Sequence, residues 1–297
     1  MKTAAIVVAV LGMCAWSLGQ GNDKPAAQTP AAAGQAQAPA AGQAAAPAGQ
    51  AAAAPQGKRK PAAKTKPEYD AYNAAIAQTD PALLEKAADD FAKNFPDSEL
   101  RAPLYTVAMG RYRQANNVDK MIEMSRRVLG IDADDPAALV GVAQGLVEGM
   151  HDTDLDKDQR TAEAKKDAEH ALVTVDTDVP TVGYPPEAVN AFKTSVRSEA
   201  YYVLGSLAYK SSNWAEAEAN LRKSIEAQPD AFTIFQLSVA LDMQNKIPEA
   251  MKFADQAVDL TKDRPDSGVG KAARAEKDRL VQLSSGTAPG QAAPPKK

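Results

Sequence analysis

The sequence predicts an all-α protein made of repeated helix pairs. Between residues 68 and 283, apolar residues recur at spacings of three and four, and proline and aspartate mark the breaks between apolar segments. No strand-like alternation accompanies this pattern. Aromatic residues make up only 5% of the chain and alanine is frequent at helix-contact spacing, so we expect helices that pack closely through small side chains.

Two copies of one pattern, 33 residues apart, define the helix pairs best. Each copy carries large apolar residues in its first half and small ones in its second half, which predicts two helices lying against each other. The first copy consists of Tyr201, Leu204, Gly205, Ala208, Trp214, Ala217, Leu221, Ser224 and Pro229, and the second of Ile234, Leu237, Ser238, Leu241, Ile247, Ala250, Ala254 and Ala257.

This pattern resembles the tetratricopeptide repeat (TPR), a helix-turn-helix unit of about 34 residues. The resemblance implies units stacked into a right-handed superhelical solenoid whose concave surface binds a partner. Residues 102–133 resemble a further unit, and residues 136–172 resemble an irregular one with an insertion at 151–158. The long helix 187–210 opens the fourth unit, and the amphipathic segment 269–283 is expected to cap the stack.

The first unit, residues 69–98, ends in Phe95-Pro96-Asp97-Ser98. This junction resembles one found in repeat proteins of the bacterial envelope that assist outer-membrane assembly or cell-division coordination. The resemblance therefore implies a TPR protein of the bacterial cell envelope.

The N-terminal 19 residues have the features of a secretory signal peptide. A charged start precedes the apolar run 3–18, and the small residues Ser17 and Gly19 predict cleavage after Gly19. The alternatives are an uncleaved inner-membrane anchor and lipidation at Cys14, the only cysteine. Cleavage leaves a mature chain without cysteine, which excludes disulfides and thiolate metal sites. We therefore expect an exported, periplasmic protein.

Residues 20–67 are expected to form a disordered linker. Residues 20–56 consist almost wholly of Ala, Pro, Gly and Gln, which cannot bury enough apolar surface to fold. Residues 57–67 carry five basic residues and no acid, and subtracting these five charges from the net charge of −4 leaves −9 for the rest. The basic stretch is either solvated or makes weak contact with an anionic envelope polymer or lipid, and the acidic remainder argues against nucleic acid. A second disordered tail is expected at 284–297.

Residues 152–163 show the spacing of an EF-hand calcium loop. Acids stand at its positions 1, 3, 5 and 12, where calcium sites place oxygen ligands. Lys157 replaces the glycine of position 6 and Gln159 stands at position 8, so the other interpretation is an inter-helix loop in which Asp156 or Asp158 caps the next helix. The candidate ligands are Asp152, Asp154, Asp156, Asp158 and Glu163. A calcium-responsive binding module is therefore the alternative function.

No catalytic site can be assembled from the sequence. His151 and His170 lie in different predicted segments without the ligand spacing of a zinc site, and no Gly-rich phosphate loop or serine-histidine-acid order is present. Gly141, Gly145 and Gly149 recur on one predicted helix face and indicate close approach of a neighbouring helix. We expect a protein without enzyme activity, metal or cofactor.

The resemblance also implies which residues face a partner, namely five positions on the first helix of each unit. In the fourth unit these are Glu199, Tyr202, Ser206, Tyr209 and Lys210, and in the fifth Phe232, Phe235, Val239, Asp242 and Met243. Tyr, Phe and Met are typical interface anchors, and the alternative is that these side chains pack between units. The second unit offers Thr106, Gly110, Arg113 and Gln114, which do not match the Lys/Asn carboxylate clamp of chaperone-binding relatives. The predicted function is a non-catalytic scaffold or adaptor for a protein or peptide.

Overall fold

The computed structural model describes residues 58–285, and within them the chain forms eleven α-helices and no strand. The predicted all-α fold is thus confirmed. The helices are α2 (Lys66–Ile76), α3 (Pro81–Asn94), α4 (Arg101–Gln114), α5 (Val118–Leu129), α6 (Pro136–Glu148), α7 (Lys157–Thr177), α8 (Pro186–Lys210), α9 (Trp214–Ala227), α10 (Ala231–Asp242), α11 (Ile247–Leu260) and α12 (Gly268–Ser284).

Several predictions about the chain ends lie outside the described residues. These are the signal peptide, Cys14, the linker up to residue 57 and the tail from residue 286. Within residues 58–285, no helix combines the length and the apolar character needed to cross a bilayer.

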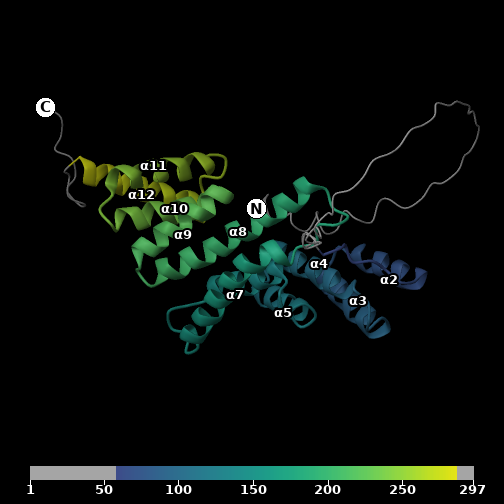
Figure 1. Cartoon of the computed structure of the whole chain (residues 1–297). Helices are drawn as coiled ribbons and strands as arrows, with labels where there is room; N and C mark the ends of the chain where they lie inside the picture. Colours follow the sequence, from purple (N-terminus) through teal and green to yellow (C-terminus); the bar gives the residue numbers. More distant parts are fainter. Residues whose placement is uncertain (1–57, 286–297) are drawn as a thin grey trace, which may run out of the picture.

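The helices stack in the order in which they occur in the chain (Figure 1). Each helix contacts the next one, and the even-numbered helices also contact one another in sequence, from α2 to α12. Figure 1 shows α2 and α3 at one end of the array and α11 and α12 at the other. An array in which each helix pair contacts mainly its neighbours is a helical-repeat solenoid, as predicted.

Aspartate and proline begin several of the helices, as expected. Asp80 precedes Pro81 in α3, and Asp135 precedes Pro136 in α6. Each aspartate accepts hydrogen bonds from backbone N–H groups of the first turn, which have no acceptor within the helix. Proline at the first helical position loses no hydrogen bond there. The observed bounds of α8 and α12 lie within one residue of the predicted ones.

The predicted junction at residues 95–98 is held by a buried carboxylate. Ser98 Oγ donates a hydrogen bond to Glu68 of α2. Glu68 also accepts from Lys64 N at 2.6 Å and forms a capping box with Thr65. The hydrogen bond from Ser98 is the main reason why the pKa of Glu68 lies below its usual value. The start of α2 is thereby fastened to the turn that leads into α4.

Glycines set the distance between neighbouring helices. A Cβ atom built on Gly205 of α8 would lie 2.7 Å from Leu221 Cδ2 of α9, and one on Gly145 of α6 would lie 2.5 Å from Ile122 Cγ1 of α5. Gly141, one turn earlier, faces α5 in the same way. These separations are far below van der Waals contact, so no residue larger than glycine fits at these positions without moving the neighbouring helix. The predicted close approach at Gly141 and Gly145 is confirmed.

The buried core runs along the whole stack. One cluster involves α2 to α5, a second lies mainly among α6, α7 and α8, and a third lies among α8 to α12. The long helix α8 contributes Phe192, Val196 and Val203 to the second cluster and Ala208 to the third. Ala217 of α9, predicted to touch another helix, is fully buried in the third cluster.

The described part of the predicted linker is packed on the helices rather than solvated. Residues 58–65, here called the strap, precede α2. Lys58 and Arg59 form ion pairs with acidic residues of the helical body, and Ala63 packs against the first core cluster. The strap is therefore attached to the folded body, because acidic turns attract the basic stretch.

We predict that Gly205→Ala lowers the free energy of unfolding by about 1–3 kcal/mol, because the added methyl group would overlap Leu221. Urea unfolding followed by circular dichroism measures this change. Gly268→Ala is the matched control, since a Cβ atom at Gly268 meets nothing within 4 Å. Equal stabilities of the two variants would contradict the packing of α8 on α9.

A second prediction concerns pH. Burial raises the pKa of Asp135, the cap of α6, to about 6, above the value of about 3.9 for an unfolded aspartate. Because the folded state holds this proton more tightly, the contribution of Asp135 to stability falls as pH rises from about 4 to about 6. Asparagine keeps the capping oxygen without the charge.

We therefore expect Asp135→Asn to raise the melting temperature at pH 7.5 and to change it little at pH 4. Thermal melts at several pH values test this, with Asp80→Asn at the exposed cap of α3 as the control. A difference between Asp135→Asn and the parent that is the same at pH 4 and pH 7.5 would contradict the prediction.

Candidate partner-binding site

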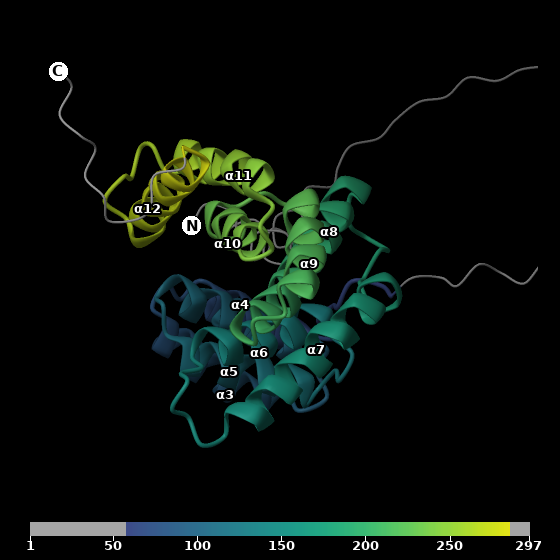
Figure 2. The same cartoon turned by 90° about the vertical axis from the view of Figure 1, so that its left-hand side faces the viewer.

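The ten residues predicted to face a partner lie on two neighbouring helices. Five lie in the second half of α8, and the other five lie on α10 and at its C-cap, Met243. Helices α8 and α10 are in contact, and α9 connects them (Figure 2). The two sets of side chains are therefore brought together, but they differ in exposure and in what they contact.

A row of apolar side chains runs along α10. Phe232, Val239 and Met243 are separated by seven and four residues, a spacing that places them on one line of the helix surface. Phe232 is 39% exposed, Met243 is 54% exposed and Val239 is partly exposed. The ring of Phe235 lies beside this line, 6.5 Å from that of Phe232 between centroids. Phe235 is partly buried and packs against the cluster of Ile234, Ala257 and Ala273. We call the other three, Phe232, Val239 and Met243, the α10 row.

Tyr202 of α8 supports the first residue of the row. Its ring centroid lies 6.2 Å from that of Phe232, and the ring packs against the second core cluster. Burial raises the pKa of the Tyr202 hydroxyl. Asp230, the cap of α10, fixes the first turn by accepting from Phe232 N at 2.9 Å. Tyr202 is therefore a partly buried neighbour of Phe232, in keeping with the alternative that some of these side chains pack between units.

Two of the ten predicted residues are buried, which corrects their predicted role. Ser206 donates to Gln236 Oε1 at 3.1 Å, which joins α8 to α10. Asp242 forms an ion pair with Arg279, which joins α10 to α12. The sequence contained a signal for the first pair: Gln236 stands where the first copy of the repeat has Val203, and a polar group at a buried position requires a partner.

An ion pair connects the N-terminal part of the stack to this region. Arg113 of α4 donates to Glu199 of α8 at 3.0 Å, and Ser195 Oγ donates to the same carboxylate at 3.2 Å. Both partners of the ion pair are mostly buried. Glu199 thus braces the stack and is not available as a free carboxylate. Of the other candidates on α4, Thr106 and Gly110 are buried and Gln114 is exposed.

The last two predicted residues lie at the end of α8. The ring of Tyr209 meets Trp214 of α9 edge-on, with 5.4 Å between ring centroids. Lys210 Nζ donates to the backbone carbonyl of Met150, at the end of α6, at 3.2 Å. Both side chains thus hold neighbouring helices together, and the α10 row is the most accessible apolar part of the predicted site.

The acidic segment 152–163 forms the loop before α7 and the start of that helix. Asp152 pairs with Lys157 at 2.8 Å, so the lysine that replaces the glycine of a calcium loop neutralises the first candidate ligand. Asp154 pairs with Arg160 at 3.1 Å. Protein cations thus occupy the carboxylates that calcium would need.

The remaining candidate ligands lie at the start of α7. Asp156 stands at the N-cap of α7 without a side-chain cap hydrogen bond, and Asp158 lies in the first turn, where its charge favours the helix. Glu163 pairs with Arg126 of α5 at 2.8 Å. Within residues 58–285, no three His, Cys, Asp or Glu side chains are grouped to hold a metal ion. The arrangement does not support the calcium interpretation.

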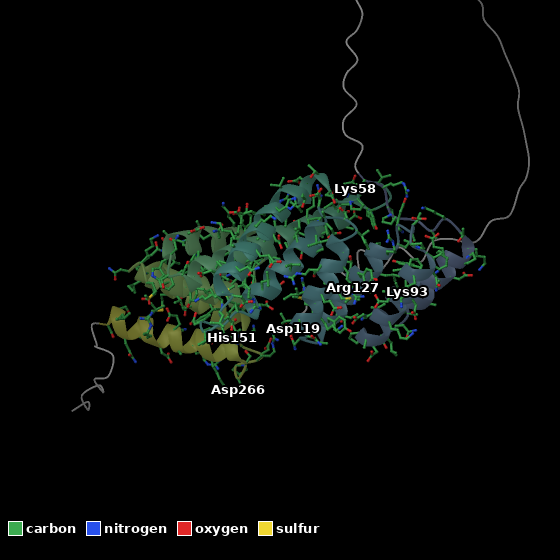
Figure 3. The ribbon with its side chains drawn as sticks, turned by 90° about the horizontal axis from the view of Figure 1, so that it is seen from below. Lys58, Lys93, Asp119, Arg127, His151 and Asp266 are labelled. Atoms are coloured by element: carbon green, nitrogen blue, oxygen red, sulfur yellow. The ribbon has the colours of Figure 1, made fainter. Side chains whose placement is uncertain are left out.

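The two histidines also lie apart. His151 is exposed in the loop between α6 and α7, with Nδ1 3.8 Å from Asp154 (Figure 3). His170 lies on α7, and its Nε2 is 2.9 Å from Asp134. Each histidine therefore has its own acidic neighbour, and the two do not share a site.

Within residues 58–285, these features define a stack of repeated helix pairs with an exposed apolar row along α10. No protein-family model matches the chain, and no curated protein matches it. Among solved structures, the chain is similar to one described as the assembly chaperone of RpL4 (Acl4), residues 1–338. The sequence identity is 12%, the TM-score is 0.38, and the match covers 73% of this chain and 98% of that chain. This likeness assigns neither a partner nor a function.

We predict that 1 mM calcium leaves the melting temperature unchanged, because lysine and arginine side chains pair with the loop carboxylates. A site with a dissociation constant of about 10 µM would add about 2.7 kcal/mol at that concentration, which a thermal melt detects. An upward shift that EDTA reverses, and that Asp152→Asn/Asp154→Asn abolishes, would contradict this prediction.

Proposed function

We propose that this chain is a non-catalytic scaffold or adaptor that binds a protein partner through the α10 row. The observation that carries the proposal is the alignment of Phe232, Val239 and Met243 on the accessible side of a helix. Ile234, Leu237 and Leu241 on the same helix are fully buried. Aligned large apolar side chains that remain accessible mark interaction sites, and Phe and Met are enriched in interfaces.

The chemistry of the row indicates the chemistry of the partner. From Phe232 to Met243 the row spans about 16 Å, at about 1.5 Å of rise per helical residue. Asp242, which precedes Met243 in the chain, is neutralised by Arg279 of α12. A partner segment with apolar side chains therefore fits better than a charged one, because it would bury the row without leaving an unpaired charge.

The repeat pattern supports the same surface. Residues 201–257 resemble two consecutive TPR units, and in that family the first helices of successive units form the partner-binding surface. Here the corresponding helices are α8 and α10, which lie side by side. We assign the protein to the TPR class on this resemblance.

The location is also part of the proposal. The apolar run 3–18 followed by Gly19 supports export, and the junction at 95–98 supports the bacterial envelope. A contact of the basic stretch with an anionic polymer is not included, because Lys58 and Arg59 are engaged by carboxylates of the same chain.

We predict that Phe232→Ala and Met243→Ala leave the free energy of unfolding within about 1 kcal/mol of the parent, because both side chains are accessible in the free protein. Leu237→Ala, at a fully buried position of the same helix, should lower it by about 2–5 kcal/mol. Binding is then tested in cells that produce the full chain with the photo-crosslinker p-benzoylphenylalanine at Val239, between the two anchors.

Crosslinking at Val239 should yield a discrete adduct, and Phe232→Ala/Met243→Ala should reduce it more than tenfold, since interface anchors contribute about 2 kcal/mol or more. Leu83 of α3 and Val173 of α7, which are 56% and 67% exposed, are the control positions for the crosslinker. The same adduct in equal yield from these odd-numbered helices would contradict the proposal.

A further inference from the structure

The strap lies along the loop that connects α7 to α8. Lys60 N donates to Val182 O at 3.1 Å, and Val182 N donates to Lys58 O at 3.2 Å. Arg59 and Val182 form an isolated parallel bridge. In Figure 3, Lys58 lies at one edge of the body, well separated in this view from His151. The strap is thus bound like an added β-strand, a recurring way of holding an extended peptide.

Acidic side chains from three turns face the basic residues of the strap. Lys58 Nζ lies 2.9 Å from Asp132, before α6, and 2.5 Å from Asp178, after α7. Arg59 lies 2.5 Å from Glu99, before α4. Burial lowers the pKa of Lys58, but its hydrogen bonds to Asp178 and Asp132 outweigh burial and raise it. The three carboxylates contact Lys58 and Arg59, while Lys60 and Lys64 add two further cations to the strap, so the surface favours a basic pair at these two positions.

The middle of the strap, between its basic residues, contributes only small side chains to the lining of a cavity. This cavity has a volume of about 1070 Å³, and the strap residues Pro61, Ala62 and Ala63 border it. Its other walls are mainly aromatic and apolar, and they include Tyr69 and Tyr72 of α2, Pro103 of α4, and Val189 and Phe192 of α8. A chain with larger apolar side chains at the positions of Ala62 and Ala63 would bury more apolar surface here.

The bonds that hold the strap are exchangeable. The side chains of Lys58 and Arg59 are 43% and 62% exposed, and ion pairs at such positions contribute little net stability. The backbone bonds to Val182 are of the kind that any extended chain forms. Another chain with the same basic pair can therefore replace the contacts of residues 58–60, while Lys64 and Thr65 keep the end of the strap bound to Glu68.

We propose that the groove under the strap is a second protein-binding surface, whose ligand is an extended segment of a partner protein with two adjacent basic residues followed by larger apolar residues. The strap is the intramolecular competitor for this groove. It supplies the basic pair and the backbone bonds, and a partner displaces it by adding side chains that fill the cavity.

Peptide binding to the full chain tests this proposal. The probes are two fluorescein-labelled peptides with the sequence of residues 57–66, one unchanged and one carrying Ala62→Leu and Ala63→Leu. Lys58→Glu/Arg59→Glu in the protein should release the strap and tighten binding of the unchanged peptide at least tenfold, measured by fluorescence anisotropy. The leucine peptide should bind at least fivefold more tightly than the unchanged one. Lys262→Glu/Lys271→Glu, with the same change in charge, should behave like the parent.

Further measurements decide where the peptide binds. Adding Glu99→Ala to the strap variant should weaken the peptide at least threefold, whereas adding Phe232→Ala should not, which separates this groove from the α10 row. Hydrogen exchange at the Lys60 amide reports whether the strap is released. Persistent protection of that amide in the strap variant, or release without gain in peptide affinity, would overturn the proposal. A dimer seen by light scattering that exchanges straps between copies would also overturn it, because the ligand would then be a second copy.

Discussion

Close approach of neighbouring helices through very small side chains is the constraint on which the rest of this structure depends. Gly205 lets α9 lie on α8, and Gly145 lets α6 lie on α5. Ala217, Ala250 and Ala254 are fully buried where later helices meet. Because protein interiors are close-packed, an added methyl group at such a contact cannot be absorbed locally and would shift the next helix in the stack. The shape of the surface formed by α8 and α10 depends on these contacts.

Small residues let the helices approach each other, and polar pairs then fix the rotation of each helix about its axis. Apolar contacts alone let a helix rotate about its axis, whereas Ser206 with Gln236, and Asp242 with Arg279, each require one orientation. With Leu237 and Leu241 buried on the inner side, the row from Phe232 to Met243 is left facing outward. The α10 row is therefore accessible because the buried polar and apolar contacts of α10 fix the orientation of that helix.

The helix pairs could be predicted from the sequence because each arises from local periodicity, caps and one repeated pattern. The repeat register also placed Phe232 and Met243 at accessible positions. It failed at Ser206 and Asp242, because their burial depends on partners that a single unit does not contain. The Arg113–Glu199 pair joins residues 86 positions apart, and no local pattern reports such a contact.

The position of the strap is another feature that could not be predicted from the sequence. Composition correctly identified a basic stretch, but its attachment depends on Glu99, Asp132 and Asp178, which come from three separate turns. Only the folded stack brings these carboxylates together. The sequence therefore shows that a basic segment will attract carboxylates. Only the tertiary structure shows whether those carboxylates belong to the same molecule.

Helix α8 contributes residues to two of the core clusters and so joins the two halves of the stack. At 25 residues it is about 37 Å long. Its buried apolar residues from Val189 to Leu207 belong to the core with α6 and α7, and Ala208 in its last turn belongs to the core with α9 to α12. In the described part of the stack, where each unit mainly contacts its neighbours, α8 belongs to both halves. Helix α10 contacts α9, α9 contacts α8, and α8 contacts α6 and α7. A force applied to α10 would therefore be transmitted to the N-terminal helices of the stack through α8.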